Sequence, residues 1–253
     1  MEGVHVGVFH TQKAGNAVSE YEDAFWPKQT AALREETMRV AVADGATDAV
    51  YSGLWARLLV KAYGKHLMTG ETIRADLKKA SEVWNRVVGR SPLPWYAEEK
   101  ARAGAYAALV GLELNRQGDG PSGNWSVLAC GDSCFFHLRS DRLIRSFPLS
   151  RAEEFSSSPL LFGSNPETRG LEALRITAGS WEDGDCFYLM SDALASWSLS
   201  SHESGENPWQ RLREITLSKG APFEDWISSL RRDRAIKNDD CTLIGIVPSI
   251  LDE

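Results

Sequence analysis

Residues 38–45 read MRVAVADG, a short apolar and partly β-branched run that ends abruptly at an aspartate and a glycine. Such a run is typical of a buried β-strand that leads directly into a loop. Three other apolar runs also have acidic residues at or near one end. They are the strand predicted over 23–26, opened by Glu22 and Asp23; FYLMS, followed by Asp192; and CTLI, preceded by Asp239 and Asp240.

Composition and charge limit the classes of protein that this chain can be. It has 253 residues, of which 43% are hydrophobic and 25% charged, as in ordinary globular proteins. The net charge of −7 disfavours a basic nucleic-acid-binding surface, so we expect no nucleic-acid partner. The N-terminus lacks the pattern of a secretory signal, and no apolar run approaches the length of a membrane helix. We therefore expect a cytoplasmic protein without a membrane partner.

Hydrophobic periodicity predicts strands and helices in alternating groups. We find no internal repeat and no dividing linker, so we expect one domain over 1–253 with its core at about 4–247. The segments 103–114, 125–129, 133–139 and 143–147 should form an antiparallel meander, and 151–170 a surface loop. The whole pattern favours an α+β layered sandwich. Other strands are predicted over 4–9, 23–26, 38–43, 174–177, 186–190 and 242–247, and helices over 51–67, 72–88, 95–102 (short helix or turn), 193–199, 208–218 and 223–234.

The acidic residues at the strand ends suggest cation chemistry. A carboxylate beside a buried strand is costly to desolvate unless it is paired or binds a cation. Oxygen ligands of this kind suit Mg²⁺ or Mn²⁺ better than Zn²⁺. Each position also has a simpler explanation: Asp44 with Gly45 is a common turn, Asp192 could cap a helix, and Asp239 could be a solvated strand entry. These simpler explanations account less well for the whole ordered set of acidic residues than for any single position.

Six short motifs follow one another in a fixed order. They are EDA at 22–24, VADG at 42–45, SGLWA at 52–56, CGDS at 130–133, SDAL at 191–194 and NDDCT at 238–242. In this order and at these separations they resemble the motifs of the metal-dependent type 2C protein phosphatases, the PPM family. The resemblance spans nearly the whole chain, from about residue 4 to residue 247.

This resemblance implies a four-layer α-β-β-α sandwich, with two mainly antiparallel sheets and helices on both outer faces. It also implies two Mg²⁺ or Mn²⁺ ions at one end of the sandwich, with a weaker third. Carried over by motif, Asp44 would bridge the two ions and the Gly45 carbonyl would join one of them. Asp192 and Asp239 would hold the other. Asp239 is preferred to Asp240, because the second position of that pair varies between Asn and Asp in the family.

The remaining acidic positions would support these ions. Glu22 and Asp23 would act directly or through water, with Asp23 counted among the metal ligands, and Asp132 would share the third ion with Asp192. The implied reaction is hydrolysis of phosphoserine or phosphothreonine in a protein by a water activated between two ions. No side-chain nucleophile is expected, since the four cysteines form no Cys-x₅-Arg loop. The implied partners are a phosphorylated protein and a cognate serine/threonine kinase.

Several positions depart from the family pattern. Val18 stands where the family often has a phosphate-binding arginine, and Ala46 where many relatives have a histidine proposed as general acid. Lys13 or Arg39 are candidates to supply the missing positive charge from elsewhere. Ala193 replaces the usual glycine, and Ser196 stands at a later acidic position, which weakens the third metal site.

These departures keep two alternatives to an active protein phosphatase open. One is a pseudophosphatase with weak or no catalysis, which would act as a regulatory binding module. The other is a hydrolase of small phosphorylated metabolites on the same scaffold.

Overall fold

Two antiparallel sheets form the centre of the protein. The computed structural model describes residues 4–27, 37–47, 51–65, 68–69, 71–90, 100–117, 122–156, 158–165, 170–218 and 223–248. The five-stranded sheet has the order β1 (Val4–Thr11), β11 (Cys241–Pro248), β10 (Cys186–Met190), β6 (Cys134–Arg139), β7 (Arg142–Phe147). The six-stranded sheet has the order β2 (Ala24–Trp26), β3 (Thr37–Gly45), β4 (Tyr106–Arg116), β5 (Gly123–Cys130), β9 (Arg175–Trp181), and the short β8 (Phe162–Gly163) also pairs with β4.

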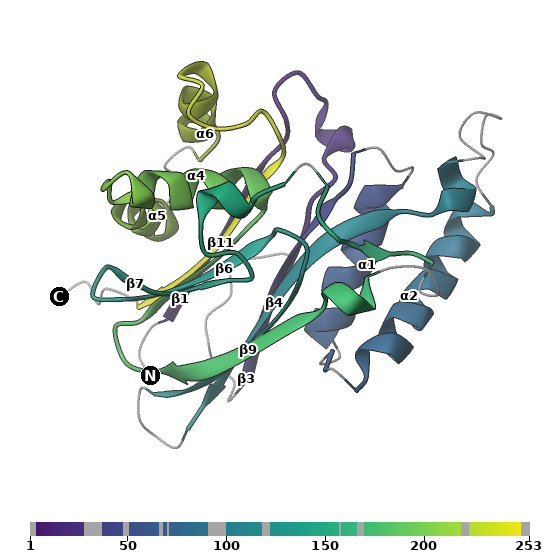
Figure 1. Ribbon diagram of the computed structural model, residues 1–253, viewed down its shortest axis with the longest axis horizontal. Coiled ribbons are helices and arrows are strands. Elements are labelled where there is room, and N and C mark those ends of the chain that lie inside the picture. The colour runs from purple at the N-terminus through teal and green to yellow at the C-terminus, as the bar shows by residue number, and fades with distance from the viewer. Residues whose placement is uncertain are drawn as a thin grey trace.

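Helices cover the outer face of each sheet, which gives four layers (Figure 1). Helices α1 (Ser52–Lys65) and α2 (Ile73–Val88) pack on the six-stranded sheet. Helices α4 (Asp192–Glu203), α5 (Pro208–Leu217) and α6 (Phe223–Arg232) pack on the five-stranded sheet. The predicted α+β sandwich of two antiparallel sheets between helical layers is confirmed. Within the described residues, no helix is both long and apolar enough to cross a membrane.

Strand β3 shows how the layers are held together. Its valines, Val40 and Val42, pack in the apolar cluster between the two sheets. The alternate residues, Ala41 and Ala43, pack in the cluster under α1 and α2, where Trp55 is fully buried. Burying one valine contributes roughly 1.5–3 kcal/mol, so both faces of this strand stabilise the fold. The strand therefore has a fixed position where it ends at Asp44.

The predicted meander is wrong. Strands β4 and β5 form a hairpin in the six-stranded sheet, whereas β6 and β7 form one in the five-stranded sheet. The chain crosses between the sheets at Gly131, whose φ of 92° lies in the left-handed region that favours glycine. A Cβ at this position would also lie 2.6 Å from the Cβ of Ala108. The Gly-Asp-Ser segment is thus a corner between layers and not a hairpin turn.

Most other predicted elements are present with shifted ends, and one prediction is corrected. The segment 151–170 was expected to be a surface loop, but it contains β8, and the side chain of Phe162 is completely buried. The predicted helix or turn over 95–102 falls mostly outside the described residues, which begin again at Lys100 in a helical turn. Residues 66 and 67, at the end of the first predicted helix, also lie outside the described residues.

Candidate metal centre

Four of the predicted acidic residues line one cavity at an end of the sandwich. The cavity has a volume of about 310 Å³. Each carboxylate comes from a different connection in the fold: the end of β3, the β5–β6 corner, the start of α4 and the segment before β11. The lining includes Asp44, Asp132, Asp192 and Asp239, together with Gly45, Ala46 and Lys237.

The pairing of β2 with β3 positions Asp23 and Asp44. Ala24 pairs with Ala43, so Asp23 and Asp44 follow at the same end of this ladder. Gly45 is required there, because a Cβ on it would lie 2.9 Å from the Glu22 carbonyl oxygen. The absent side chain thus lets the start of β2 approach the end of β3.

The pairing of β10 with β11 positions the other two aspartates. Beyond this ladder the Ser191 amide donates to the Thr242 carbonyl at 3.2 Å, and the Thr242 amide donates to Ser191 Oγ at 3.0 Å. Asp192 follows Ser191 directly and begins α4, while Asp239 precedes β11 by two residues. Asp192 Oδ1 accepts the amide of Ala193 at 2.6 Å, so this carboxylate also serves the first turn of the helix.

Asp23 is a buried carboxylate with an unused oxygen. Its side chain is only 2% exposed, and its Oδ2 accepts the Thr242 hydroxyl at 2.6 Å. The Tyr21 hydroxyl is hydrogen-bonded to the same Thr242 hydroxyl. Among the described residues, Oδ1 of Asp23 has no hydrogen-bond partner. Burial raises the pKa of Asp23 to about 8, and the nearby negative charge of Asp240 also raises it.

Asp44 and Asp132 show the same excess of negative charge. Burial raises the pKa of Asp44 well above its usual value, and the negative charges of Asp23 and Asp192 add to this increase. Burial also raises the pKa of Asp132 to about 7, with Asp192 as the next cause. Mutual repulsion among buried carboxylates favours a bound cation or a bound proton. Carboxylate oxygens are the ligand type that suits a hard divalent ion, so the chemistry of these residues is compatible with one.

A lysine occupies part of this acidic cluster. Lys237 Nζ lies 2.7 Å from Asp239 Oδ2 and 3.3 Å from Asp192 Oδ2. Within the described residues, no group of three acidic, histidine or cysteine side chains is arranged to hold a metal ion as it lies. The carboxylates thus share a cavity, while two of them are paired with an ammonium group.

Asp240 and Glu22 lie outside this cavity. Asp240 Oδ1 accepts the amide of Lys13 at 2.8 Å, and its Oδ2 accepts the amide of Glu22 at 2.7 Å. Both oxygens therefore bind backbone groups, and Asp240 anchors two segments. Glu22 lines a neighbouring cavity of about 370 Å³ and accepts the Ser52 hydroxyl. Burial raises the pKa of Glu22.

The family's arginine and histidine have no counterpart at their usual places. Val18 is 74% exposed, and Ala46 presents only a methyl group to the cavity. Arg39, one candidate for the missing charge, is paired with Glu113 at 2.7 Å on the body of β3. Lys13 contributes its backbone amide to Asp240, and neither candidate is among the described residues lining the cavity.

Sequence reasoning missed Lys237, and it interpreted Arg231 only as part of a basic run at a solvated helix end. Arg231 Nη2 donates to the carbonyl oxygen of Asp239 at 2.6 Å and so fixes the segment that carries this carboxylate. The only signal for Lys237 is its place two residues before Asp239, and such proximity does not fix the direction of a long side chain.

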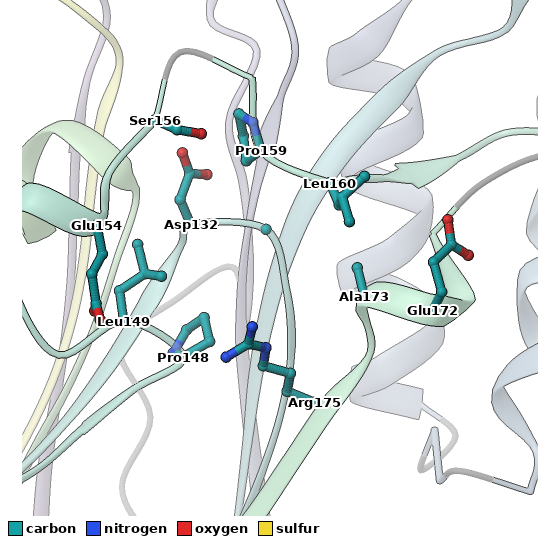
Figure 2. Close-up of a pocket in the computed structure, with 11 residues that line it drawn as sticks. Asp132, Pro148, Leu149, Glu154, Ser156, Pro159, Leu160, Glu172, Ala173 and Arg175 are labelled. Carbon is teal, nitrogen blue, oxygen red and sulfur yellow. The ribbon is translucent and has the colours of Figure 1, made fainter.

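Two further cavities adjoin the acidic one. Figure 2 shows the first, of about 240 Å³, with Asp132 and Ser156 facing each other at one end and Arg175 at the other. The second, of about 410 Å³, is lined partly by Phe155 and Trp197. Asp132 and Ser156 line all three cavities, so Asp132 stands where they meet.

The sequence and the fold identify the family. The family model for protein phosphatase 2C matches residues 19–228, which is most of the chain. The protein therefore belongs to the protein phosphatase 2C family, as the motifs suggested. A comparison with curated proteins found no match.

Solved structures show the same fold at low sequence identity. The photosystem II phosphatase PBCP is 16% identical, with a TM-score of 0.57, covering 98% of this chain and 100% of PBCP. The catalytic domain of the serine/threonine phosphatase PstP, in complex with two manganese ions, is 15% identical, with a TM-score of 0.55 and coverage of 97% and 99%. RsbX in complex with magnesium is 18% identical, with a TM-score of 0.52 and 98% of both chains covered.

Proposed function

We propose that this protein is a Mg²⁺- or Mn²⁺-dependent phosphatase that hydrolyses phosphoserine or phosphothreonine in a protein substrate. Its phosphatase family supports the general class of reaction. The observation that carries the finer proposal is the cavity where Asp44, Asp132, Asp192 and Asp239 meet. A cognate serine/threonine kinase is the proposed source of the phosphorylated partner.

Each residue has a distinct part in this proposal. Bound divalent ions would neutralise charge on the phosphoryl group and lower the pKa of a water molecule. Asp44, Asp192, Asp239 and the Gly45 carbonyl would hold the two ions. Asp23, held by Thr242, would complete the set.

The negative charge of Asp192 raises the pKa of Asp132, so the two carboxylates repel each other electrostatically. This fits the proposal of a weaker third ion between them. Glu22 would act from the neighbouring cavity, through water. Within the residues described, none of the buried cysteines lines the acidic cavity, which agrees with a reaction that needs no thiol nucleophile.

The adjoining cavities favour a peptide over a small metabolite as substrate. A phosphorylated side chain at the acidic cavity would place its neighbours beside two spaces of different chemistry. One space contains Arg175 and two glutamates, and the other contains Phe155 and Trp197. A small phosphate ester would leave both spaces empty.

The test is hydrolysis of a phosphothreonine peptide by wild type and Asp192→Asn in EDTA, Mg²⁺ or Mn²⁺. We expect activity only with metal, and a loss of at least about 100-fold in Asp192→Asn, since a lost charge-stabilising group costs roughly 3 kcal/mol or more. Asp183→Asn is the matched control, because this exposed aspartate lies in the β9–β10 turn away from the cavity. Activity that persists in EDTA or in Asp192→Asn refutes the proposal.

A binding module without turnover is the second candidate. Val18 and Ala46 favour it, because neither supplies the phosphate-binding cation or the proton donor that relatives often have. Metal-dependent stabilisation of the wild type without hydrolysis of any phosphopeptide or phosphometabolite would support this candidate. Turnover of metabolites alone would instead select the small-molecule hydrolase.

A further inference from the structure

Lys237 has an unusual position for a basic residue. Among the described residues lining the acidic cavity, it is the single basic one, facing four aspartates. Its ammonium group pairs with Asp192 and Asp239, at 3.3 and 2.7 Å. These two carboxylates are the pair assigned above to one metal ion.

The backbone around Lys237 is fixed independently of its side chain. Arg231 holds the Asp239 carbonyl, and the Asn238 side chain exchanges two hydrogen bonds with the backbone of Ala14, at 2.9 and 3.2 Å. The Asp239 amide also donates to the Lys237 carbonyl at 3.0 Å. The segment that carries Asp239 therefore keeps its support if the ammonium group leaves.

The ammonium group itself is free to leave. The Lys237 side chain is 66% exposed, so water is available to solvate it outside the cavity. Ion pairs with one exposed member contribute little to stability, because solvent screens them and the long side chain loses rotamer freedom. A divalent ion between the same oxygens would carry twice the charge at shorter distances.

We propose that Lys237 is a tethered cation that occupies the place of one divalent ion between Asp192 and Asp239. Metal binding at this pair is then an exchange, in which the ammonium group moves into solvent as the ion enters. The exchange turns a net charge of −1, from two carboxylates and one ammonium, into zero. The inference rests on the metal assignment of the proposed function, and it makes Lys237 a residue that lowers the affinity for metal.

The test measures metal binding without any substrate. Mn²⁺ is titrated calorimetrically into the metal-free full-length wild type, Lys237→Met, Lys237→Arg and Lys79→Met. Lys79 is a matched control, because it is 75% exposed and pairs at 3.5 Å with Asp76 on α2. We expect Lys237→Met to bind Mn²⁺ about five- to tenfold more tightly, the range that two weak ion pairs correspond to. Lys237→Arg, which keeps the cation, and Lys79→Met should bind as the wild type does.

Thermal unfolding gives a second readout that also checks folding. In EDTA, Lys237→Met should melt below the wild type, since its carboxylates lose their counter-charge, and saturating Mn²⁺ should reverse or abolish this difference. Equal or weaker Mn²⁺ binding by Lys237→Met overturns the inference, as does the absence of Mn²⁺ binding in every variant. Tighter binding without phosphopeptide turnover supports the inference while refuting the phosphatase proposal.

Discussion

The buried carboxylate of Asp23 makes the stability of the metal-free protein depend on pH in an unusual direction. The pKa of Asp23 rises from 3.8 to about 8 in the fold. Between these values the native state retains a proton that the unfolded chain releases. The free energy of unfolding therefore falls as pH rises through this range, by about 1.4 kcal/mol per pH unit for one such group.

The size of the effect follows from the same values. From pH 5 to pH 7.5 the Asp23 contribution reaches at most about 3 kcal/mol, a large share of the stability of a typical domain. Asp132 adds to the fall with the same sign up to its pKa of about 7. Asp23→Asn removes the first contribution, because the amide cannot ionise and its oxygen still accepts the Thr242 hydroxyl.

Urea denaturation in EDTA at several pH values from 5 to 7.5 measures this dependence. We expect the wild type to lose stability across the series, and Asp23→Asn to lose distinctly less. Saturating Mn²⁺ should flatten or reverse the wild-type trend, because ion binding requires deprotonated carboxylates. A wild type whose metal-free stability stays constant or increases with pH, or an Asp23→Asn variant with the wild-type slope, would refute the reasoning.

Three further predictions concern the residues around the cavity. Thr242→Val removes the hydroxyl between Asp23 and Tyr21 and should lower the free energy of unfolding by about 2 kcal/mol, measured by urea denaturation at pH 7. An unchanged denaturation midpoint would contradict this role. Asp240→Asn should destabilise the protein by about 1–3 kcal/mol with or without Mn²⁺, because one of its two backbone donors loses its acceptor. Asp239→Asn should instead mainly abolish the stabilisation by Mn²⁺. If Asp240→Asn abolished it and Asp239→Asn only destabilised the protein, Asp240 would be the metal ligand and Asp239 the backbone anchor.

Local elements could be predicted from the sequence because their signal is local. The apolar and partly β-branched run of β3 already indicates a buried strand, and the structure places its two sets of side chains in separate cores. The apolar spacing of α1 and α2 likewise predicted helices that pack on one face. In each case burial and periodicity agree, so the residues alone determine the element.

The assignment of strands to sheets could not be predicted in this way. Two strands joined by a short Gly-containing segment resemble a hairpin whether they pair or separate. The crossing is accompanied by the left-handed conformation of Gly131 and by the lack of room for a Cβ there beside Ala108, and both depend on packing between distant segments. The same corner places Asp132 at the cavity. The crossing between the sheets that the predicted meander lacked therefore also determines the position of this carboxylate.

The gathering of the acidic residues at one cavity was predictable to the extent that they stand at strand ends. Strand ends at one edge of a sandwich bring their acidic residues together, and this holds for Asp44, Asp192 and Asp239. The roles of neighbouring charged residues were not predictable, because they depend on side-chain direction. Asp240 points to backbone amides, and Lys237 turns back onto the aspartates.

Burial of the acidic cluster is sustained by the cores on either side of it. Leaving Asp23 without a cation costs at most a few kcal/mol near neutral pH, as worked out above. A few buried valine or leucine side chains, at roughly 1.5–3 kcal/mol each, offset that cost. The strands that hold the cluster carry many such residues, among them Val40 and Val42. The fold can therefore hold these carboxylates at the cavity before any ion binds, and under the proposed function their final arrangement around an ion requires Lys237 to leave Asp192 and Asp239.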